Sequence, residues 1–208
     1  MKALIGRQFL VATLFLAGLA PVAMAVPRYY EIAGATVNGN LLDPGLVINT
    51  AVSPTLAGTN FTLNDGGSTT FSLFDIWTDE TTINPDDFGT RTISATLNFS
   101  DPVTGVTVNG ITFGGSILFG VAQWGQIQWD GPTTVTLGDR VFTVSLSDEV
   151  FNWGLFGLSA GNCWGATIEA TITQISSSQA VPENGDTAIM LGAAVIGLVS
   201  FSRKRLTS

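Results

Sequence analysis

Short runs in which apolar and polar residues alternate fill the middle of this 208-residue chain. Successive side chains of a β-strand point to opposite faces, so an alternating run folds into a strand with one apolar face. Residues 91–99, 141–147 and 166–173 show this pattern, and no segment between residues 26 and 175 shows a convincing helical period. We therefore predict one all-β domain over residues 26–175, an antiparallel β-sandwich of the jelly-roll or immunoglobulin-like kind.

Residues that favour turns separate the predicted strands at intervals of about ten residues. Asn109-Gly110 is flanked by two short alternating runs, and it predicts a two-residue hairpin because both residues tolerate positive φ. Gly138-Asp139 predicts a second hairpin in the same way. Further turns are predicted at Asp65-Gly66-Gly67 and at Asp130-Gly131-Pro132.

The first 25 residues have the three parts of a cleavable secretory signal. Two basic residues stand near the start, residues 9–19 form an apolar core, and Ala23 and Ala25 form a small-x-small cleavage site. The apolar core is shorter than the roughly 20 residues that a membrane-spanning helix needs. We expect a signal helix that enters the Sec translocon and is removed by signal peptidase.

The C-terminal end has a different three-part pattern, which begins after a short polar linker at residues 176–180. A polar motif at 181–187 precedes an uncharged apolar segment at 188–202, which we interpret as a transmembrane helix with a buried core helix as the alternative. Three basic residues follow and would keep that end of the helix on the cytoplasmic side: Arg203, Lys204 and Arg205. The pattern predicts that residues 181–208 are a sorting tail.

This tail resembles the PEP-CTERM class of bacterial sorting signals, and within that class its VPDSG-CTERM variant. Glu183 and Asn184 stand where the variant has Asp and Ser, whereas four residues match it: Val181, Pro182, Gly185 and Thr187. The resemblance implies that an exosortase-like membrane protease is a partner and that the protein reaches the cell envelope, in association with exopolysaccharide. It covers only about residues 181–206, so it implies nothing about the activity of the β domain.

The charge of the predicted domain is strongly one-sided. Residues 26–180 carry three arginines and no lysine against 14 carboxylates, a net charge of about −11. This charge repels nucleic acid and anionic lipid, and we exclude nucleic acid as a partner. The chain has no histidine, which removes serine–histidine catalysis and histidine-ligated zinc. The single cysteine, Cys163, can form no intrachain disulfide, and we predict that it is buried and inert.

Carboxylates gather between residues 74 and 89: Asp75, Asp79, Glu80, Asp86 and Asp87. Hard oxygen ligands on a loop of an exported protein suit a weak Ca²⁺ site, for which Asp79, Asp86 and Asp87 are the candidates. Their spacing matches no EF-hand loop, and a solvated acidic loop is the interpretation that we favour. We expect no other metal or cofactor.

Two tryptophans are candidates for sugar binding, because an aromatic face can stack on a sugar ring while nearby amides bind hydroxyl groups. Trp124 and Trp129 are five residues apart, so on a regular strand they point to opposite faces, and at least one of them is expected in the core. Asp148 and Glu149 offer the paired carboxylates that glycosidases use. Nothing beyond proximity marks this pair, and we expect it to serve a turn.

Together these features predict an exported bacterial protein that its tail holds transiently in the membrane before it reaches the cell envelope. We expect a cell-surface or extracellular-matrix protein with a structural or adhesive role, associated with exopolysaccharide and without enzymatic activity. The alternative is a carbohydrate-binding module that uses exposed tryptophans.

Overall fold

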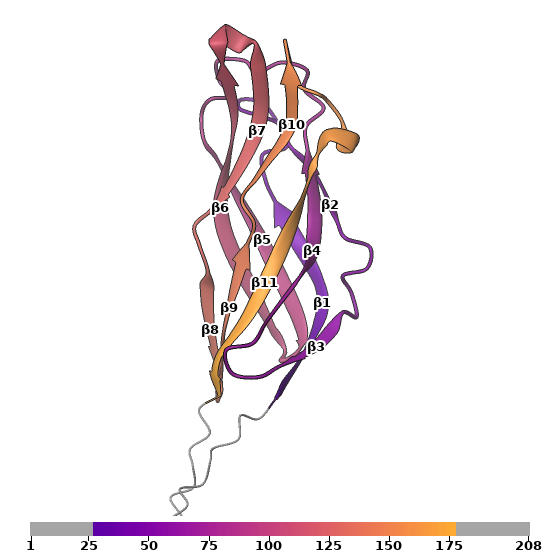
Figure 1. Cartoon of the computed structure of the whole chain (residues 1–208), viewed down its shortest axis with the longest axis vertical. Coiled ribbons are helices and arrows are strands. Elements are labelled where there is room, and N and C mark those ends of the chain that lie inside the picture. The colour runs from indigo at the N-terminus through magenta and orange to yellow at the C-terminus, as the bar shows by residue number, and fades with distance from the viewer. Residues whose placement is uncertain (1–26, 178–208) are drawn as a thin grey trace, which may run out of the picture.

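The computed structural model describes residues 27–177, which form two curled antiparallel β-sheets (Figure 1). Sheet A has six strands in the order β10-β7-β6-β5-β1-β3, and sheet B has five in the order β2-β4-β11-β9-β8. The predicted all-β class is therefore confirmed. The strands of sheet A are β1 Arg28–Asn38, β3 Asn60–Leu63, β5 Arg91–Asp101, β6 Thr104–Ile117, β7 Ala122–Trp129 and β10 Glu149–Leu155. Those of sheet B are β2 Asn49–Val52, β4 Ser68–Trp77, β8 Thr133–Leu137, β9 Arg140–Leu146 and β11 Ala166–Ser177, and two 3-10 turns complete the described part, η1 Leu118–Gly120 and η2 Asn162–Trp164.

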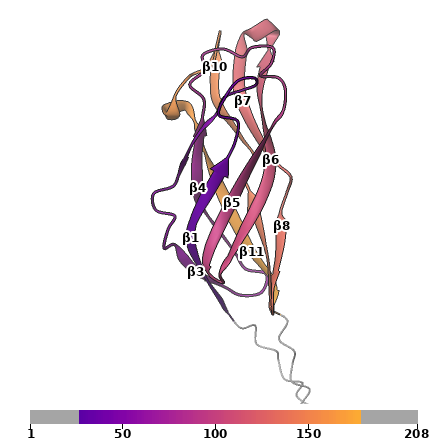
Figure 2. The ribbon, with the colours of Figure 1, turned by 180° about the vertical axis from the view of Figure 1, so that it is seen from behind.

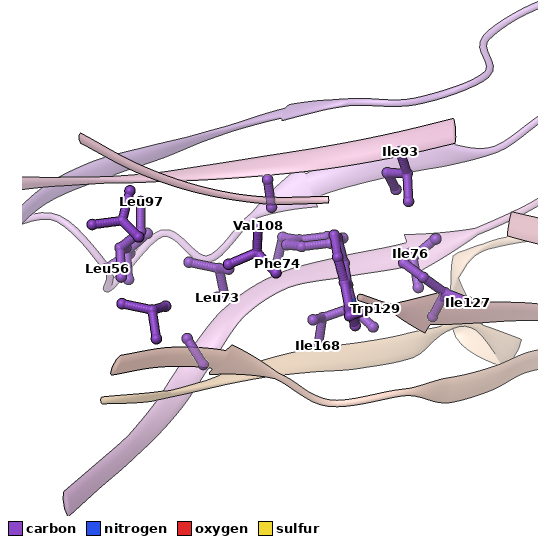
Figure 3. Close-up of a cluster of buried hydrophobic side chains, with 14 of the residues drawn as sticks. Leu56, Leu73, Phe74, Ile76, Ile93, Leu97, Val108, Ile127, Trp129 and Ile168 are labelled. Carbon is purple, nitrogen blue, oxygen red and sulfur yellow. The ribbon is translucent and has the colours of Figure 1, made fainter. Parts of the chain in front are cut away.

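One hydrophobic core lies between the two sheets and takes side chains from both (Figure 3). Alternate residues of each strand point into it, since the side-chain period of a strand is two. Near its centre the rings of Phe74 from β4 and Trp129 from β7 meet edge to face, with 6.3 Å between their centroids. Each such large apolar side chain stabilises the fold by roughly 1.5–3 kcal/mol on burial.

The alternating runs in the sequence fall on strands of the structure. They lie in β5, β9 and β11, where their alternating apolar members are buried except for Leu146 and Ala166, which are partly buried against the core. Gly138-Asp139 joins β8 to β9, and Gly138 has the positive φ of +60° that the hairpin requires. The turns predicted at residues 65–67 and 130–132 also join consecutive strands.

The hairpin predicted at Asn109-Gly110 is wrong, because β6 runs straight through both residues. Neither has a positive φ, and the chain turns instead at residues 102–103, between β5 and β6. Gly110 serves a close approach: a Cβ there would lie 2.8 Å from Cε3 of the Trp129 ring and 2.4 Å from the Gln128 carbonyl oxygen. Glycine in a strand thus makes room for the neighbouring strand and for a core indole.

Both ends of the described chain lie at one end of the domain, which we call the base (Figures 1 and 2). The β8–β9 hairpin holds them there. Arg28 at the start of β1 forms an ion pair with Asp139 of the hairpin. At the end of β11, Ser177 lies opposite Arg140 in the antiparallel pairing of β11 with β9. The opposite end, which we call the tip, is formed by loops 39–48, 78–90 and 156–165 together with η1.

The predicted signal helix (1–25) and transmembrane helix (188–202) lie outside the described residues. Within residues 27–177, no helix has the length and apolar character to span a bilayer.

A buried hydroxyl links the sheets near the base. Tyr30 of β1 is fully buried, packs edge to face on Phe142 and donates its phenolic proton to Gln174 of β11. Burial, the largest cause, raises the pKa of Tyr30 above its ordinary value of 10.0. Since the unfolded chain then loses the proton first, this contribution to stability is present below pH 10 and is lost as pH rises above it.

Tyr30→Phe is therefore expected to lower the free energy of unfolding by about 1–2 kcal/mol at pH 7, because Gln174 loses a buried donor. The variant should also lose less stability than the wild type between pH 9 and pH 11. Urea titrations at these pH values measure both effects. An unchanged midpoint at pH 7 would contradict a stabilising role for this bond.

Candidate functional site

Exposed apolar side chains gather at the tip. The β6–β7 connection and the end of β10 lie side by side there, because Ala122 pairs with both Ile117 and Leu155. Leu118 and Phe156 have positive φ values of 49° and 58°, a conformation that large side chains rarely adopt. The exposed large apolar residues on the strand ends and loops of the tip are Leu41, Leu42, Phe88, Ile117, Leu118, Leu155, Phe156 and Trp164.

Of the two tryptophans proposed for sugar binding, Trp129 lies in the core. It is 9% exposed, and its indole N–H donates to the Ser147 carbonyl at 3.1 Å. The Asp148 carboxylate accepts the Trp129 backbone N–H at 2.8 Å and so connects the segment before β10 to the end of β7. Trp129 therefore offers no face to a ligand.

Trp124 points to the opposite, outer face of sheet A, as its spacing from Trp129 predicts. It stands directly opposite Gly115 of β6, where a Cβ would lie 2.4 Å from Cε2 of the indole. The ring therefore packs across the neighbouring strand, and Trp124 remains partly exposed. Gln126 and Gln128 follow it on the same face.

A second outer-face tryptophan, Trp153, is not among the residues selected from the sequence. Strand β10 shifts register between Phe151 and Gly154, opposite Trp124 of β7. Asn152 takes a φ of +52° at this bulge and turns inward, so the next residue, Trp153, faces outward and is 53% exposed. The signal in the sequence is an asparagine, which tolerates positive φ, directly before the tryptophan.

The Asn152 side chain anchors this bulge to the tip. Its Oδ1 accepts the Thr78 backbone N–H at 2.9 Å, and its Nδ2 donates to the Gly161 carbonyl at 3.0 Å and to the Ser159 carbonyl. One fully buried amide thus connects β10, the end of β4 and the 156–165 loop.

The carboxylates of loop 78–90 mostly accept backbone or amide N–H groups. Asp79 accepts from the Asn49 amide at 3.0 Å, and Asp86 accepts the Gly45 N–H at 3.0 Å. The Gly45 bond, aided by Arg91, holds the pKa of Asp86 below its ordinary value. The outer-face carboxylate of β4, Asp75, accepts the Thr167 hydroxyl. Among residues 27–177, no three acidic, histidine or cysteine side chains converge to hold a metal, so Asp79, Asp86 and Asp87 form no shared cluster.

Glu80 and Asp87 are placed differently, because they turn toward the interior. Oε1 of Glu80 accepts the Val47 N–H at 2.7 Å, and Oδ2 of Asp87 accepts the Asn84 N–H at 2.6 Å. Burial is the largest cause that raises the pKa of Glu80, and the negative charges of Asp87 and Asp43 raise it further. Glu80 also lines an open pocket of about 540 Å³ at the tip, with Asp43, Val47, Asn49, Thr78, Asp79, Thr81, Thr82 and Asn84.

The prediction that Cys163 is buried is wrong, since its side chain is exposed. Residues 161–165 form a surface turn that begins at Gly161 with a φ of +95°. The backbone of this turn holds it to the domain, through the Gly161 N–H and the Thr78 carbonyl at 2.8 Å, and none of the three residues of η2 is buried.

Comparison with protein-family models, with curated proteins and with solved structures finds no match to this chain. Its function must therefore be inferred from its own residues.

Proposed function

We propose that this chain is an exported bacterial cell-surface or extracellular-matrix protein whose β domain makes structural or adhesive contacts with exopolysaccharide. A signal peptide and a C-terminal sorting tail flank the β-sandwich in this proposal, and an exosortase-like protease processes the tail. One observation carries it: both ends of the described domain lie at the base, whereas most of its exposed apolar side chains lie at the tip. A domain held through its ends presents the opposite end to its surroundings.

The composition supports contact over catalysis. Residues 26–180 hold no histidine and no lysine, so the most frequent general base and the lysine amine nucleophile are absent from them. Their net charge of about −11, from three arginines and 14 carboxylates, favours a soluble domain that nucleic acid does not approach.

A carbohydrate-binding module is the second candidate, and the outer face of sheet A favours it. Trp124 and Trp153 stand on adjacent strands at the same level, because the β10 bulge lies opposite Trp124. Gln126 adds an amide on the same face that can donate to and accept from sugar hydroxyls. We propose this aromatic face as the sugar-binding surface.

Trp124→Ala and Trp153→Ala are each expected to weaken binding of the exported protein to bacterial exopolysaccharide by about thirtyfold. Truncating a tryptophan at a binding hot spot commonly removes about 2 kcal/mol. Biolayer interferometry on immobilised polysaccharide gives the affinities. Tyr29→Ala is the matched control, because this aromatic side chain is 41% exposed but lies at the base.

Saturable binding that both tryptophan variants lose and the control keeps would favour the carbohydrate-binding module. Binding that survives in all three variants would exclude the aromatic face as the sugar site. Absence of binding by the wild type would leave the structural role without a polysaccharide ligand and contradict both proposals.

A further inference from the structure

Buried polar atoms without a hydrogen-bond partner concentrate in the tip half of the domain. Among the described residues they include Oε2 of Glu80, Oδ1 of Asp87, Oγ1 of Thr112 and Nε of Arg91. Buried polar atoms in folded proteins nearly always have a partner, so each of these groups needs an explanation, and a bound ion is one of them. Three of these four atoms are oxygens, and two of them belong to carboxylates.

The Asp87 side chain is held deep in the domain by its own backbone. The Asp87 backbone carbonyl accepts the Gly114 N–H of β6 at 2.7 Å. The Cβ atom of Asp87 packs against Gly114, where an added Cβ would lie only 3.2 Å from it. Asp87 is therefore only 1% exposed although it belongs to a surface loop. Thr112, the next inward-facing residue of β6, is fully buried beside this position.

The Glu80 carboxyl group lies within hydrogen-bonding reach of the Asp87 carboxyl group. The oxygens that no N–H or O–H group approaches are Oε2 of Glu80 and Oδ1 of Asp87, while the other oxygen of each accepts a backbone N–H. Two carboxylates cannot face each other in a buried site unless a proton or a cation lies between them.

The protein supplies no cation of its own at this place. Arg91 is the one arginine of the tip, and its charge lowers the pKa of Asp86. Arg28 and Arg140 lie at the base. Asp43 adds a further negative charge near Glu80. A metal cation between these carboxyl groups would therefore come from solution, and the open pocket that Glu80 lines gives it a path.

We propose that Glu80 and Asp87 bind one Ca²⁺ ion between their free oxygens, at the inner end of the tip pocket. Ca²⁺ suits the site better than Mg²⁺, because it accepts irregular sets of carboxylate, carbonyl, hydroxyl and water oxygens. Mg²⁺ demands a near-ideal octahedron that a pair of loop carboxylates does not supply. Of the calcium ligands predicted from the sequence, the proposal keeps Asp87 and replaces Asp79 and Asp86 with Glu80. It does not depend on polysaccharide binding.

The test measures thermal unfolding of the EDTA-treated, dialysed full-length exported protein with added CaCl₂ or MgCl₂. Calcium at about 100 times the dissociation constant should raise Tm by roughly 5–10 °C, and Mg²⁺ should raise it much less. Isothermal titration calorimetry should show one calcium ion per chain.

The variant Asp87→Asn distinguishes between a bound cation and a shared proton as the species that lies between the two carboxyl groups. The new amide can donate to Glu80, so the metal-free variant is expected to fold with a Tm close to that of the metal-free wild type. It should no longer respond to calcium, and Glu80→Gln should behave in the same way. Asp79→Asn, an exposed change in the same loop, should keep the full calcium response.

A wild-type Tm that does not respond to calcium, but falls as pH rises from 5 to 8, would show that only a proton bridges the pair and would overturn the proposal. A calcium response that survives in both Asp87→Asn and Glu80→Gln would place the ion elsewhere and overturn it equally.

Discussion

Asn152→Ala is expected to lower the free energy of unfolding by about 3–4 kcal/mol. The change removes the acceptor of the Thr78 N–H and the donors to the Ser159 and Gly161 carbonyls, all of them in the tip. An unsatisfied buried polar group costs about 1–3 kcal/mol. Alanine also tolerates the φ of +52° poorly, at a cost of about 1–2 kcal/mol. Urea unfolding followed by tryptophan fluorescence measures the loss.

Asn152→Gly is the matched control for the backbone term. Glycine accepts the positive φ without strain but lacks the amide, so this variant should recover about 1 kcal/mol relative to alanine. Equal stabilities of the wild type and both variants would show that neither the amide nor the backbone geometry of Asn152 stabilises the tip.

The alternating runs predict the strands well because strand periodicity depends on local residues and on burial of one face. Each inward residue of β5 from Ile93 to Phe99 is identified correctly from its position in the pattern alone. The pairing of the strands does not follow from this pattern. Sheet A places β1 between β5 and β3, which are distant in sequence, and no local signal encodes that order.

The error at Asn109-Gly110 has a physical cause that concerns the whole fold. This dipeptide favours a turn, but Gly110 is required where β6 passes a core indole, and long-range packing outweighs the local preference. The wrong prediction that Cys163 is buried also reflects the limits of local sequence. Cys163 lies in a surface turn with no buried residues, and such a turn has no alternating pattern that would reveal it in the sequence.

The candidate sites were predictable only in part. Spacing alone places Trp124 and Trp129 on opposite faces, and the structure shows which of them is the core member, Trp129. Trp153 depends on a bulge that shifts the side-chain period by one, and the facing of Glu80 and Asp87 depends on how loop 78–90 folds against β6. Neither arrangement can be derived from the spacing of residue types.

The C-terminal tail gives the prediction with the largest expected effect on the cell. We propose that residues 181–187 are a processing motif and that residues 188–202 are a transient membrane segment. In this proposal the apolar segment partitions into the bilayer while the three basic residues behind it resist translocation, so that the motif is held at the outer membrane–water boundary. Pro182 favours an extended backbone there, and Gly185 disfavours continuation of the helix through the motif.

Deleting residues 188–208 is therefore expected to release nearly all of the protein into the soluble exported fraction, still folded and without cleavage at the motif. Replacing Pro182 and Glu183 together should instead leave a full-length precursor in the membrane fraction. Gln179→Ala, just outside the motif, is the matched control and should be processed as the wild type is. Fractionation with intact-mass analysis distinguishes these species, because the tail adds a defined mass. The opposite result is that both variants reach the same fraction as the wild type and that their masses differ from its mass only by the changes introduced. In that case residues 181–208 are an anchor or a core helix and not a sorting signal.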